Sequence, residues 1–371
     1  MHTELCDRFD IDYPIFVFTP SEKVAAAVTR AGGMGVLGCV RFNDPDDLES
    51  VLNWMDANTD GKPYGVDIVM PAKVPTEGTT VDIGKLIPQT HRDFVAKTLA
   101  DLGVPPLPEE GTGNDGVLGW LHSVARSHVD VALGHRISLI ANALGSPPAD
   151  VIEQAHAVGV PLAALAGTAA HARRHVDNGV DIVVAQGYEA GGHTGEIASM
   201  VLVPEVVDAV GTTPVLAAGG IGTGRQVAAA LALGASGVWM GSAFLTAAEY
   251  DLGVRDGDGP SVIQQALLAA TSSDTVRRRI YSGKPARLLK SRWTHAWDAE
   301  DAPDPLPMPL QNVLVAQAHQ RMSQSHDPTA VAMPVGQIVG RMNEIQPAAE
   351  IIAELVSGFE AASLRLDDIR G

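Results

Sequence analysis

Short apolar runs alternate along this chain with segments whose apolar residues recur every three to four positions. Eight runs have the length and composition of buried strands, at residues 15–18, 35–39, 65–69, 136–142, 162–166, 181–186, 214–218 and 237–241. Helical patterns lie at 149–158, 169–178, 204–210 and 224–233, and most end at a glycine suited to a C-terminal cap. Apolar strands joined by helices pair in parallel, so the eight units predict an α/β fold, a (β/α)8 TIM barrel.

Two tracts interrupt this alternation. Residues 71–132 separate the third and fourth strands by far more chain than one barrel unit needs, and they include helical patterns at 89–102 and 117–129. Residues 253–342 follow the eighth strand. We predict that the two tracts form one inserted lid subdomain that selects the substrate. Residues 1–70, 133–252 and 343–371 would form the barrel, with a closing helix at 347–369.

Composition and charge narrow the class of protein. With 46% hydrophobic and 19% charged residues, the 371-residue chain can bury a large core. Its 26 basic and 44 acidic residues give a net charge of −18, so we expect neither nucleic acid nor an anionic membrane as a partner. The uncharged stretch 226–248 could span a bilayer, but its glycines divide it into a helix, a short strand and a new helix start, which favours a buried segment.

Cysteine usage indicates the compartment. Cys6 and Cys39 are too few for a disulfide framework, and the charged first ten residues lack the pattern of a secretory signal. We therefore expect a cytoplasmic protein. Acidic enzymes of this size often pair, so a homodimer is a further expectation.

A Gly-x-Gly-x-x-Gly pattern at Gly33, Gly35 and Gly38 raises the alternative of a dinucleotide-binding fold. That pattern binds pyrophosphate only where it follows a strand and opens a helix. Here the helical pattern comes first and the strand follows. We therefore interpret these glycines as a helix cap and a tight turn.

Two glycine-rich loops follow the last two predicted strands. Gly219, Gly220 and Gly222 come after one strand, and Gly241 and Ser242 come after the other, each before a helical segment. In TIM barrels these loops commonly bind phosphate, because glycine lets the ligand approach and helix N–H groups meet the anion. We predict a phosphate-bearing cofactor, with simple turns as the alternative.

His193 lies in the glycine-rich run QGYEAGGHTG, which follows the sixth predicted strand. The glycines let the backbone pass close to a flat ligand and hold the imidazole at the barrel mouth, so we predict that His193 is a general acid/base or an anion-stabilising group. His171 and His175 have the spacing of a metal pair, but no third ligand is near, and we predict no metal site. No lysine lies at the ends of strands four to eight and no cysteine on a strand-end loop, which disfavours Schiff-base and thiol chemistry.

These segments resemble the nitronate monooxygenase family, formerly called 2-nitropropane dioxygenases, and its relatives the flavin-dependent enoyl-acyl-carrier-protein reductases. The similarity lies in PIF at 14–16, AAAVTRAGGMGVLG at 25–38, GYEAGGHTGE at 187–196, and PVLAAGGIGTGR through MGSAFLTAAE at 214–249. The resemblance implies a TIM barrel that holds FMN without a covalent bond. The phosphate would lie on the loops after strands seven and eight, and the ring would lie across the mouth.

The resemblance also implies roles for single positions. His193 would be the catalytic histidine. Asp67 stands where the family usually has Asn beside the flavin, Phe18 begins the segment that replaces the family's first turn, and Leu165 stands near the place of a lysine found in many members. Ala218, Gly220, Gly241 and Ser242 would hold the phosphate, and the rest of the cofactor site would comprise Phe18, Asp67, Gln186, Gly191, Gly192 and Gly219.

From this resemblance we predict an FMN-dependent enzyme that uses O2 to oxidise alkyl nitronates, the anions of nitroalkanes, to carbonyl compounds. The small-molecule substrate would bind under the lid near His193. Two alternatives stay open. One is an NAD(P)H-dependent FMN reductase of an enoyl thioester, which GGHTGEIASMVLVPEVV at 191–207 resembles equally well. The other is a non-catalytic flavin-binding or nucleotide-binding barrel.

Overall fold

The computed structural model describes residues 1–70, 83–106 and 122–370. Its main unit is a closed barrel of eight parallel strands in the order β1-β2-β3-β4-β5-β6-β8-β9. The eight predicted strands and the TIM barrel are therefore confirmed. The barrel strands are β1 (Ile15–Thr19), β2 (Met34–Gly38), β3 (Tyr64–Asp67), β4 (Ile137–Asn142), β5 (Leu162–Ala166), β6 (Ile182–Gln186), β8 (Val215–Ala218) and β9 (Gly237–Met240).

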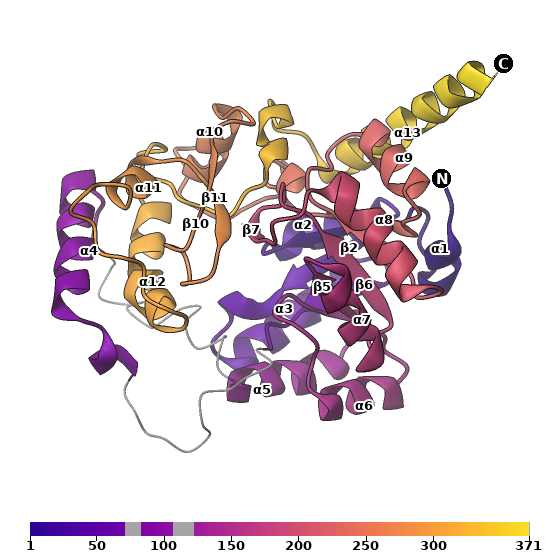
Figure 1. Ribbon diagram of the computed structural model, residues 1–371, viewed down its shortest axis with the longest axis horizontal. Coiled ribbons are helices and arrows are strands. Elements are labelled where there is room, and N and C mark those ends of the chain that lie inside the picture. Colours follow the sequence, from indigo (N-terminus) through magenta and orange to yellow (C-terminus); the bar gives the residue numbers. More distant parts are fainter. Residues whose placement is uncertain (71–82, 107–121, 371) are drawn as a thin grey trace.

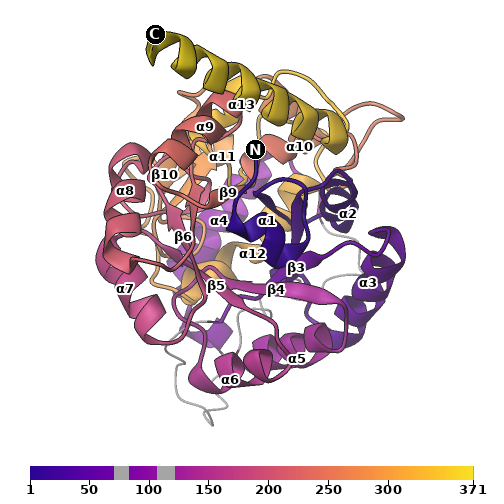
Figure 2. The same cartoon turned by 90° about the vertical axis from the view of Figure 1, so that its right-hand side faces the viewer.

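A ring of helices covers the outside of the barrel (Figure 2). It comprises α2 (Glu22–Arg30), α3 (Pro45–Asn58), α5 (His122–Leu133), α6 (Ala149–Ala157), α7 (Ala169–Asp177), α8 (Ser199–Val210), α9 (Gly224–Ala232) and α13 (Ala348–Arg370). The short helix α1 (Glu4–Phe9) instead closes the base of the barrel, where the strands begin. Its Leu5, Cys6 and Phe9 belong to the same cluster as the inward-facing residues of the barrel strands.

Glycines at the helix ends confirm the predicted capping pattern. Helices α6, α7, α8 and α9 are each followed within two residues by a glycine with positive φ, at Gly159, Gly179, Gly211 and Gly234. The Gly33, Gly35 and Gly38 pattern is confirmed as structural, because α2 precedes β2. At Gly35 an added Cβ would lie 2.0 Å from the Ala25 carbonyl oxygen, so glycine there allows the helix to pack against the strand.

Helix α8 begins earlier than the sequence predicted. We predicted a start at Pro204, but the helix begins at Ser199 and contains Pro204 in its second turn. The cap comes from outside the helix: the Glu189 carboxylate accepts hydrogen bonds from the Ser199 N–H at 3.0 and 3.2 Å. Proline removes one N–H donor, and the carbonyl left without it is that of Met200, an exposed residue that water can reach.

A second unit lies on the side of the strand carboxyl ends (Figure 1). It contains an antiparallel sheet in the order β10-β11-β7, formed by β10 (Thr275–Arg278), β11 (Ala286–Leu289) and the two-residue strand β7 (Gly192–His193). Its helices are α4 (Gln89–Leu102), α11 (Arg292–Ala296) and α12 (Leu310–Ser323). Their core includes Leu99, Trp293, Trp297 and Val315, so segments from both predicted tracts pack together.

The remaining elements pack mainly on the barrel. Helix α10 (Val262–Leu268) and the 3-10 helix η5 (Gln337–Arg341) contribute to the largest barrel cluster. Helix α5 contributes Ala125 and Val129 to a cluster with Leu48 and Leu52 of α3. The placement of α5, α10 and η5 differs from the predicted division, which puts all of residues 71–132 and 253–342 in the lid. The rest of that division stays a prediction.

Besides η5, the described residues form the 3-10 helices η1 (Cys39–Arg41), η2 (Ile83–Leu86) and η4 (Ser242–Phe244). The uncharged stretch 226–248 divides into α9, β9 and η4, as predicted from its glycines. Among the described residues, no helix has both the length and the apolar character needed to cross a membrane.

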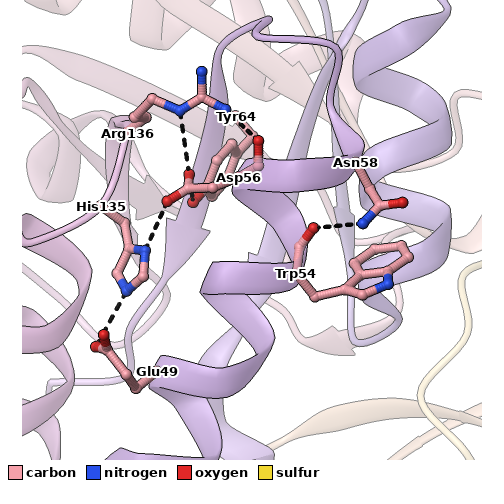
Figure 3. A network of polar contacts seen from close by, with 7 residues as sticks. All are labelled: Glu49, Trp54, Asp56, Asn58, Tyr64, His135 and Arg136. Atoms are coloured by element: carbon pink, nitrogen blue, oxygen red, sulfur yellow. Dashed lines mark hydrogen bonds and ion pairs between the residues drawn. The ribbon is translucent and has the colours of Figure 1, made fainter.

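A paired polar network lies near the amino ends of β3 and β4 (Figure 3). The Asp56 carboxylate accepts hydrogen bonds from the Tyr64 hydroxyl and from His135 Nδ1, both at 2.8 Å. Arg136 donates to the Asp56 carbonyl, and His135 Nε2 lies 3.1 Å from Glu49 Oε2. Burial acts to raise the pKa of Asp56, but the hydrogen bonds from His135 and Tyr64 outweigh it and hold that pKa below its ordinary value.

Candidate active site

The inward-facing side chains at the carboxyl end of the barrel form its uppermost interior layer. Phe18 and Leu165 pack against the cluster that fills the barrel interior, and Ala218 belongs to it. Val184 is also interior, so strand alternation directs Gln186, two residues further along β6, to the same side. The structure thus brings three predicted cofactor residues, Phe18, Gln186 and Ala218, to one ring at the barrel mouth.

Asp67 faces the same layer from the end of β3. Tyr64 and Val66 belong to the outer cluster, so alternation turns Asp67 inward. Its register partners are Gly38 on β2 and Ala141 on β4, which leaves small residues on both sides. Asp67 is only 3% exposed, and burial raises its pKa to about 7.

The loop after β8 is built on two glycines with positive φ, Gly219 at 102° and Gly220 at 71°. The Gln226 side chain holds this loop to the start of α9: its Oε1 accepts from the Gly222 N–H at 3.0 Å, and its Nε2 donates to the Gly220 carbonyl at 2.5 Å. Thr223, at the cap of α9, makes no side-chain bond to the first N–H groups of the helix. Such a helix start favours an anion.

The loop after β9 places Gly241 and Ser242 beside this helix start on the neighbouring strand. The Ser242 hydroxyl oxygen accepts a hydrogen bond from the Gly336 N–H at 2.8 Å, so its own O–H remains a donor. Both glycine-rich loops therefore stand at adjacent strand ends with donors that suit a phosphate, as the sequence predicts for such a site.

The segment from β6 to β7 is packed tightly against residues near 336. At Gly191 an added Cβ would lie 2.7–2.8 Å from backbone atoms of Val335 and Gly336, so only glycine fits there. Gly192 has a φ of 74°. The Glu189 carbonyl accepts a hydrogen bond from Gln337 at 2.9 Å, which fixes the other side of the segment.

His193 lies on β7, seven residues beyond the end of β6, and pairs with Ala286 of β11. Its Nε2 and the Ser282 hydroxyl oxygen are 2.5 Å apart. The Tyr281 ring meets the imidazole edge to face at a centroid distance of 6.3 Å. Burial, assisted by the positive charge of Lys284, lowers the pKa of His193 to about 4, so the imidazole is neutral at pH 7.

Positive charge collects around the segment that carries His193. Arg287 is 2% exposed, and its guanidinium donates to the Tyr188 carbonyl at 2.9 and 3.1 Å and to the Thr275 hydroxyl at 3.0 Å. None of these acceptors carries a charge, so the cation of Arg287 is not neutralised by them. Arg277 lies 3.6 Å from Glu196, a highly exposed carboxylate. This environment favours an anionic ligand.

An aromatic group extends from His193 into the second unit. Tyr281 stacks on His319 with a centroid distance of 4.8 Å and an interplanar angle of 19°, and Trp293 meets the His319 ring at 6.0 Å. Burial lowers the pKa of His319 to about 4. The wall beside His193 is therefore aromatic and uncharged.

The sequence did not single out Ser282, Tyr281, Arg287 or His319 for the site. Ser282 and Arg287 reach the site through β11, which pairs with β7 across about 93 residues of sequence. No local sequence spacing predicts such a pairing, because antiparallel strands can pair at any separation along the sequence. The run of three arginines at 277–279 is the nearest signal.

The alternative metal pair on α7 is not arranged as one. His175 is buried, with Nδ1 2.8 Å from the Ser146 hydroxyl and Nε2 3.1 Å from the Leu165 carbonyl. His171 has no part in these contacts. Within the ranges that the structure describes, no three His, Cys, Asp or Glu side chains are grouped to hold a metal ion.

A closed parallel barrel with glycine-rich loops after its last two strands and a histidine beside its mouth defines a class of TIM-barrel enzymes whose site suits a phosphate-bearing ligand. The chain belongs to the nitronate monooxygenase family, whose sequence profile, described as Nitronate monooxygenase, matches residues 3–358. It is therefore a flavin-dependent oxidoreductase. The chemistry at family level is flavin-dependent oxidation of nitro compounds.

Individual relatives agree with this family. Rv1533 of Mycobacterium tuberculosis, whose name provisionally calls it a monooxygenase, is 48% identical over 97% of this chain and 96% of its own length. A Staphylococcus aureus protein named as a probable nitronate monooxygenase is 27% identical over 95% of this chain and 96% of its own.

Solved structures cover nearly all of the chain. Nitroalkane oxidase from Streptomyces ansochromogenes superposes with a TM-score of 0.78 and 27% identity, over 98% of this chain and 99% of that chain. FabK from Thermotoga maritima, an enoyl-acyl-carrier-protein reductase, gives a TM-score of 0.74 and 28% identity, over 100% and 99%. Both branches named from the sequence are therefore represented among the similar structures.

Proposed function

We propose that the protein uses FMN and O2 to oxidise alkyl nitronates to carbonyl compounds. The observation that carries this proposal is the neutral imidazole of His193, which lies beside an aromatic wall and a segment whose Arg287 contacts only uncharged acceptors among the described residues. A nitronate is a small, flat anion. It suits a site that offers positive potential, a polar contact and apolar surface together.

The mouth of the barrel also supports the proposed cofactor. Ala141 and Ala218 carry small side chains at the uppermost layer, and the Phe18 ring lies over Gly38, where an added Cβ would be 2.9 Å from it. This small and aromatic lining suits a flat ring. In our proposal Gly220, Gly241, Ser242 and the start of α9 hold the FMN phosphate, and Phe18, Asp67, Gln186, Gly191, Gly192 and Gly219 line the rest. Bound FMN would supply the electron-accepting chemistry, and the chain would supply orientation and a site shielded from water.

The state of His193 bears on which form of the substrate is used. A base with a pKa near 4 accepts a proton poorly at neutral pH, so it would abstract a proton from a neutral nitroalkane slowly. A neutral imidazole can still donate a hydrogen bond to an anion that is already formed. We therefore assign His193 to stabilising the nitronate and keeping it in position, with Ser282 fixing the ring.

Lys284 and Arg287 would have different roles in this site. Lys284 is exposed and its charge reaches His193, as the lowered pKa of that histidine reflects. Arg287 is buried and anchors the loop that carries His193 by binding the Tyr188 carbonyl. In our proposal the first attracts the substrate and the second holds the segment in place.

The structural similarity to FabK favours one competing function, NAD(P)H-dependent reduction of an enoyl thioester. The test is to mix the flavin-loaded protein, without oxygen, with a primary alkyl nitronate or with NADPH, and to follow the visible band of the flavin. We expect the nitronate to bleach it and NADPH to leave it unchanged. Rapid bleaching by NADPH, with none by the nitronate, would establish the reductase instead.

Two further arms complete this test. Bleaching by neither compound would support the non-catalytic barrel. With oxygen present, we expect the nitronate to be consumed faster than the parent nitroalkane, with formation of the carbonyl product. If the nitroalkane were the faster substrate, His193 would have to act as a base and our assignment of its role would be wrong.

A further inference from the structure

The mouth of the barrel contains one carboxyl group, Asp67, whose interactions differ from those of the other buried polar groups described above. Asp67 lies at the carboxyl end of β3 and is 3% exposed. Among the described residues, the structure shows no hydrogen bond or ion pair to its side chain. A buried carboxylate with no donor and no cation is costly, whereas a buried carboxylic acid has lost far less solvation.

The elements around Asp67 supply no compensating charge. On the side of β2, Cys39 has a fully buried thiol whose pKa is raised by burial and by Asp67, so it is neutral. Arg41 forms an ion pair with Glu22 at 2.5 Å and stacks on a phenyl ring. On the side of β4, Asn142 binds the Met70 backbone through both its amide oxygen and its amide nitrogen, each at 3.0 Å.

Barrel geometry directs Asp67 toward the place where the flavin would lie. It shares the uppermost interior layer with Phe18 and Gln186. The Phe18 ring lies over Gly38, where an added Cβ would be 2.9 Å from it, and on the other side of Asp67 the register partner is Ala141, whose side chain is a single methyl group. A carboxylic acid has one O–H donor. A flavin ring system presents nitrogen and oxygen acceptors along one edge, so the two are complementary.

We propose that Asp67 enters the cofactor site as a carboxylic acid that donates a hydrogen bond to the bound flavin, and that its ionisation places a negative charge against the flavin ring. This inference rests on the flavin part of the proposed function and not on the nitronate. Burial, which raises the pKa of Asp67 to about 7, agrees with the geometry. The residue would make the flavin environment sensitive to pH in the neutral range.

The first experiment is a pH titration of the oxidised, flavin-loaded enzyme between pH 5.5 and 9, in the absence of substrate, read from the visible absorption band. We expect a single transition with a midpoint at or above about pH 7 in the wild-type protein. Asp67→Asn, which keeps the size and a donor but cannot ionise, should lose it. Asp150→Asn is the matched control, because Asp150 is an exposed partner of Arg126 on the outside of the barrel. It should titrate like the wild type.

Infrared spectroscopy tests the protonation directly and also serves if Asp67→Asn fails to retain flavin. The carbonyl band of a protonated carboxyl group should be present in the wild-type protein at pH 6. It should disappear over the same pH range in which the visible band shifts. A visible transition without loss of that band, or a transition that persists in Asp67→Asn, would overturn the inference.

The outcomes separate this inference from the proposed function. An enzyme that oxidises nitronates but shows no transition dependent on Asp67 would refute only the role of Asp67. An enzyme that shows the transition but does not oxidise nitronates would refute only the substrate. A protein that takes up no flavin would refute both.

Discussion

Each end of the barrel holds a carboxyl group, and the two carboxyl groups have opposite surroundings. At the base, Asp56 is bound by His135, Tyr64 and Arg136, and its pKa is lowered. At the mouth, Asp67 is more deeply buried, has no partner among the described residues, and its pKa is raised. Both groups are carboxyls at the ends of neighbouring elements, and only their surroundings differ.

Charged side chains in and beside a cleft at the base are also paired. This cleft has a volume of about 670 Å³ and is lined by residues that include Arg8, Lys62 and Asp181. Arg8 lies 3.5 Å from Asp181, and Lys62 lies 3.5 Å from Asp12. In TIM barrels the mouth carries the chemistry and the base carries stability. The contrast therefore teaches that the buried carboxyl group at the working end of this barrel, Asp67, is held differently from the carboxylates at the base.

The strongest challenge to this contrast is His193→Asn. We expect kcat/KM for a nitronate to fall by about 100- to 1,000-fold, about 3–4 kcal/mol, because the anion loses a donor in a partly dry site. The free energy of unfolding should fall by only about 1 kcal/mol, because the imidazole loses its contact with Ser282. Enzyme kinetics together with denaturant unfolding measure both quantities.

His171→Asn is the matched control for this substitution, since His171 is an exposed residue on α7. It should leave kcat/KM unchanged. If His193→Asn retained activity and lost stability, the mouth would be a structural region and the contrast would be wrong.

Asp56→Ala should have the opposite outcome. It leaves Tyr64 and His135 without their acceptor, so we expect the free energy of unfolding to fall by about 2–3 kcal/mol. This is less than a fully buried network would lose, because the Asp56 side chain is 24% exposed. The kcat/KM of the folded fraction should not change. Glu49→Ala should cost less than about 1 kcal/mol, because the Glu49 side chain is 51% exposed.

The effect of pH on this network has a definite sign. The pKa of Asp56 is lower in the folded protein than its ordinary value of 3.8. Its contribution to stability is therefore complete above the ordinary value and is lost as the pH falls through the folded value. Acid titration of the unfolding midpoint should show this loss in the wild type and a smaller one in Asp56→Ala.

The contrast also separates what the sequence could predict from what it could not. Apolar runs such as 162–166 and 181–186 predict strands because each is short and a helical pattern that ends near a glycine comes next along the chain. Gly219 and Gly220 could be placed for the same reason, since a glycine-rich turn after a strand is a local signal. These features depend on neighbours within a few residues.

Features that depend on distant residues were not predictable. Helix α8 is capped by Glu189, ten residues before the helix starts, and Pro204 therefore gave a false boundary. His193 is held by Ser282. Asp67 has no partner within the described part of the chain because β2 and β4 place Gly38 and Ala141 beside it. Sequence resemblance supplied candidate residues there, but their charge states came from the fold.

Asp67→Asn should have a smaller effect, a change in how the free energy of unfolding of the flavin-free protein depends on pH. The pKa of Asp67 rises from 3.8 to about 7 on folding, so the folded state binds more protons than the unfolded state in this range. Wild-type stability should therefore decline as the pH rises, by roughly 2 kcal/mol between pH 5 and pH 8 relative to the variant. Unfolding at a series of pH values measures this slope, and parallel curves for the two proteins would contradict a raised pKa.

Ser282→Ala should give the smallest effect, because Ser282 acts through His193. Its hydroxyl is 2.5 Å from His193 Nε2 and also accepts from the Lys284 N–H at 3.3 Å. Without it the imidazole loses one anchor, and we expect kcat for a nitronate to fall about five- to tenfold, near 1 kcal/mol, with KM little changed. Ser282→Thr keeps the hydroxyl and should restore most of the rate. Equal losses in Ser282→Ala and Ser282→Thr would show that the site lacks room for a side-chain change, and that the hydrogen bond does not position His193.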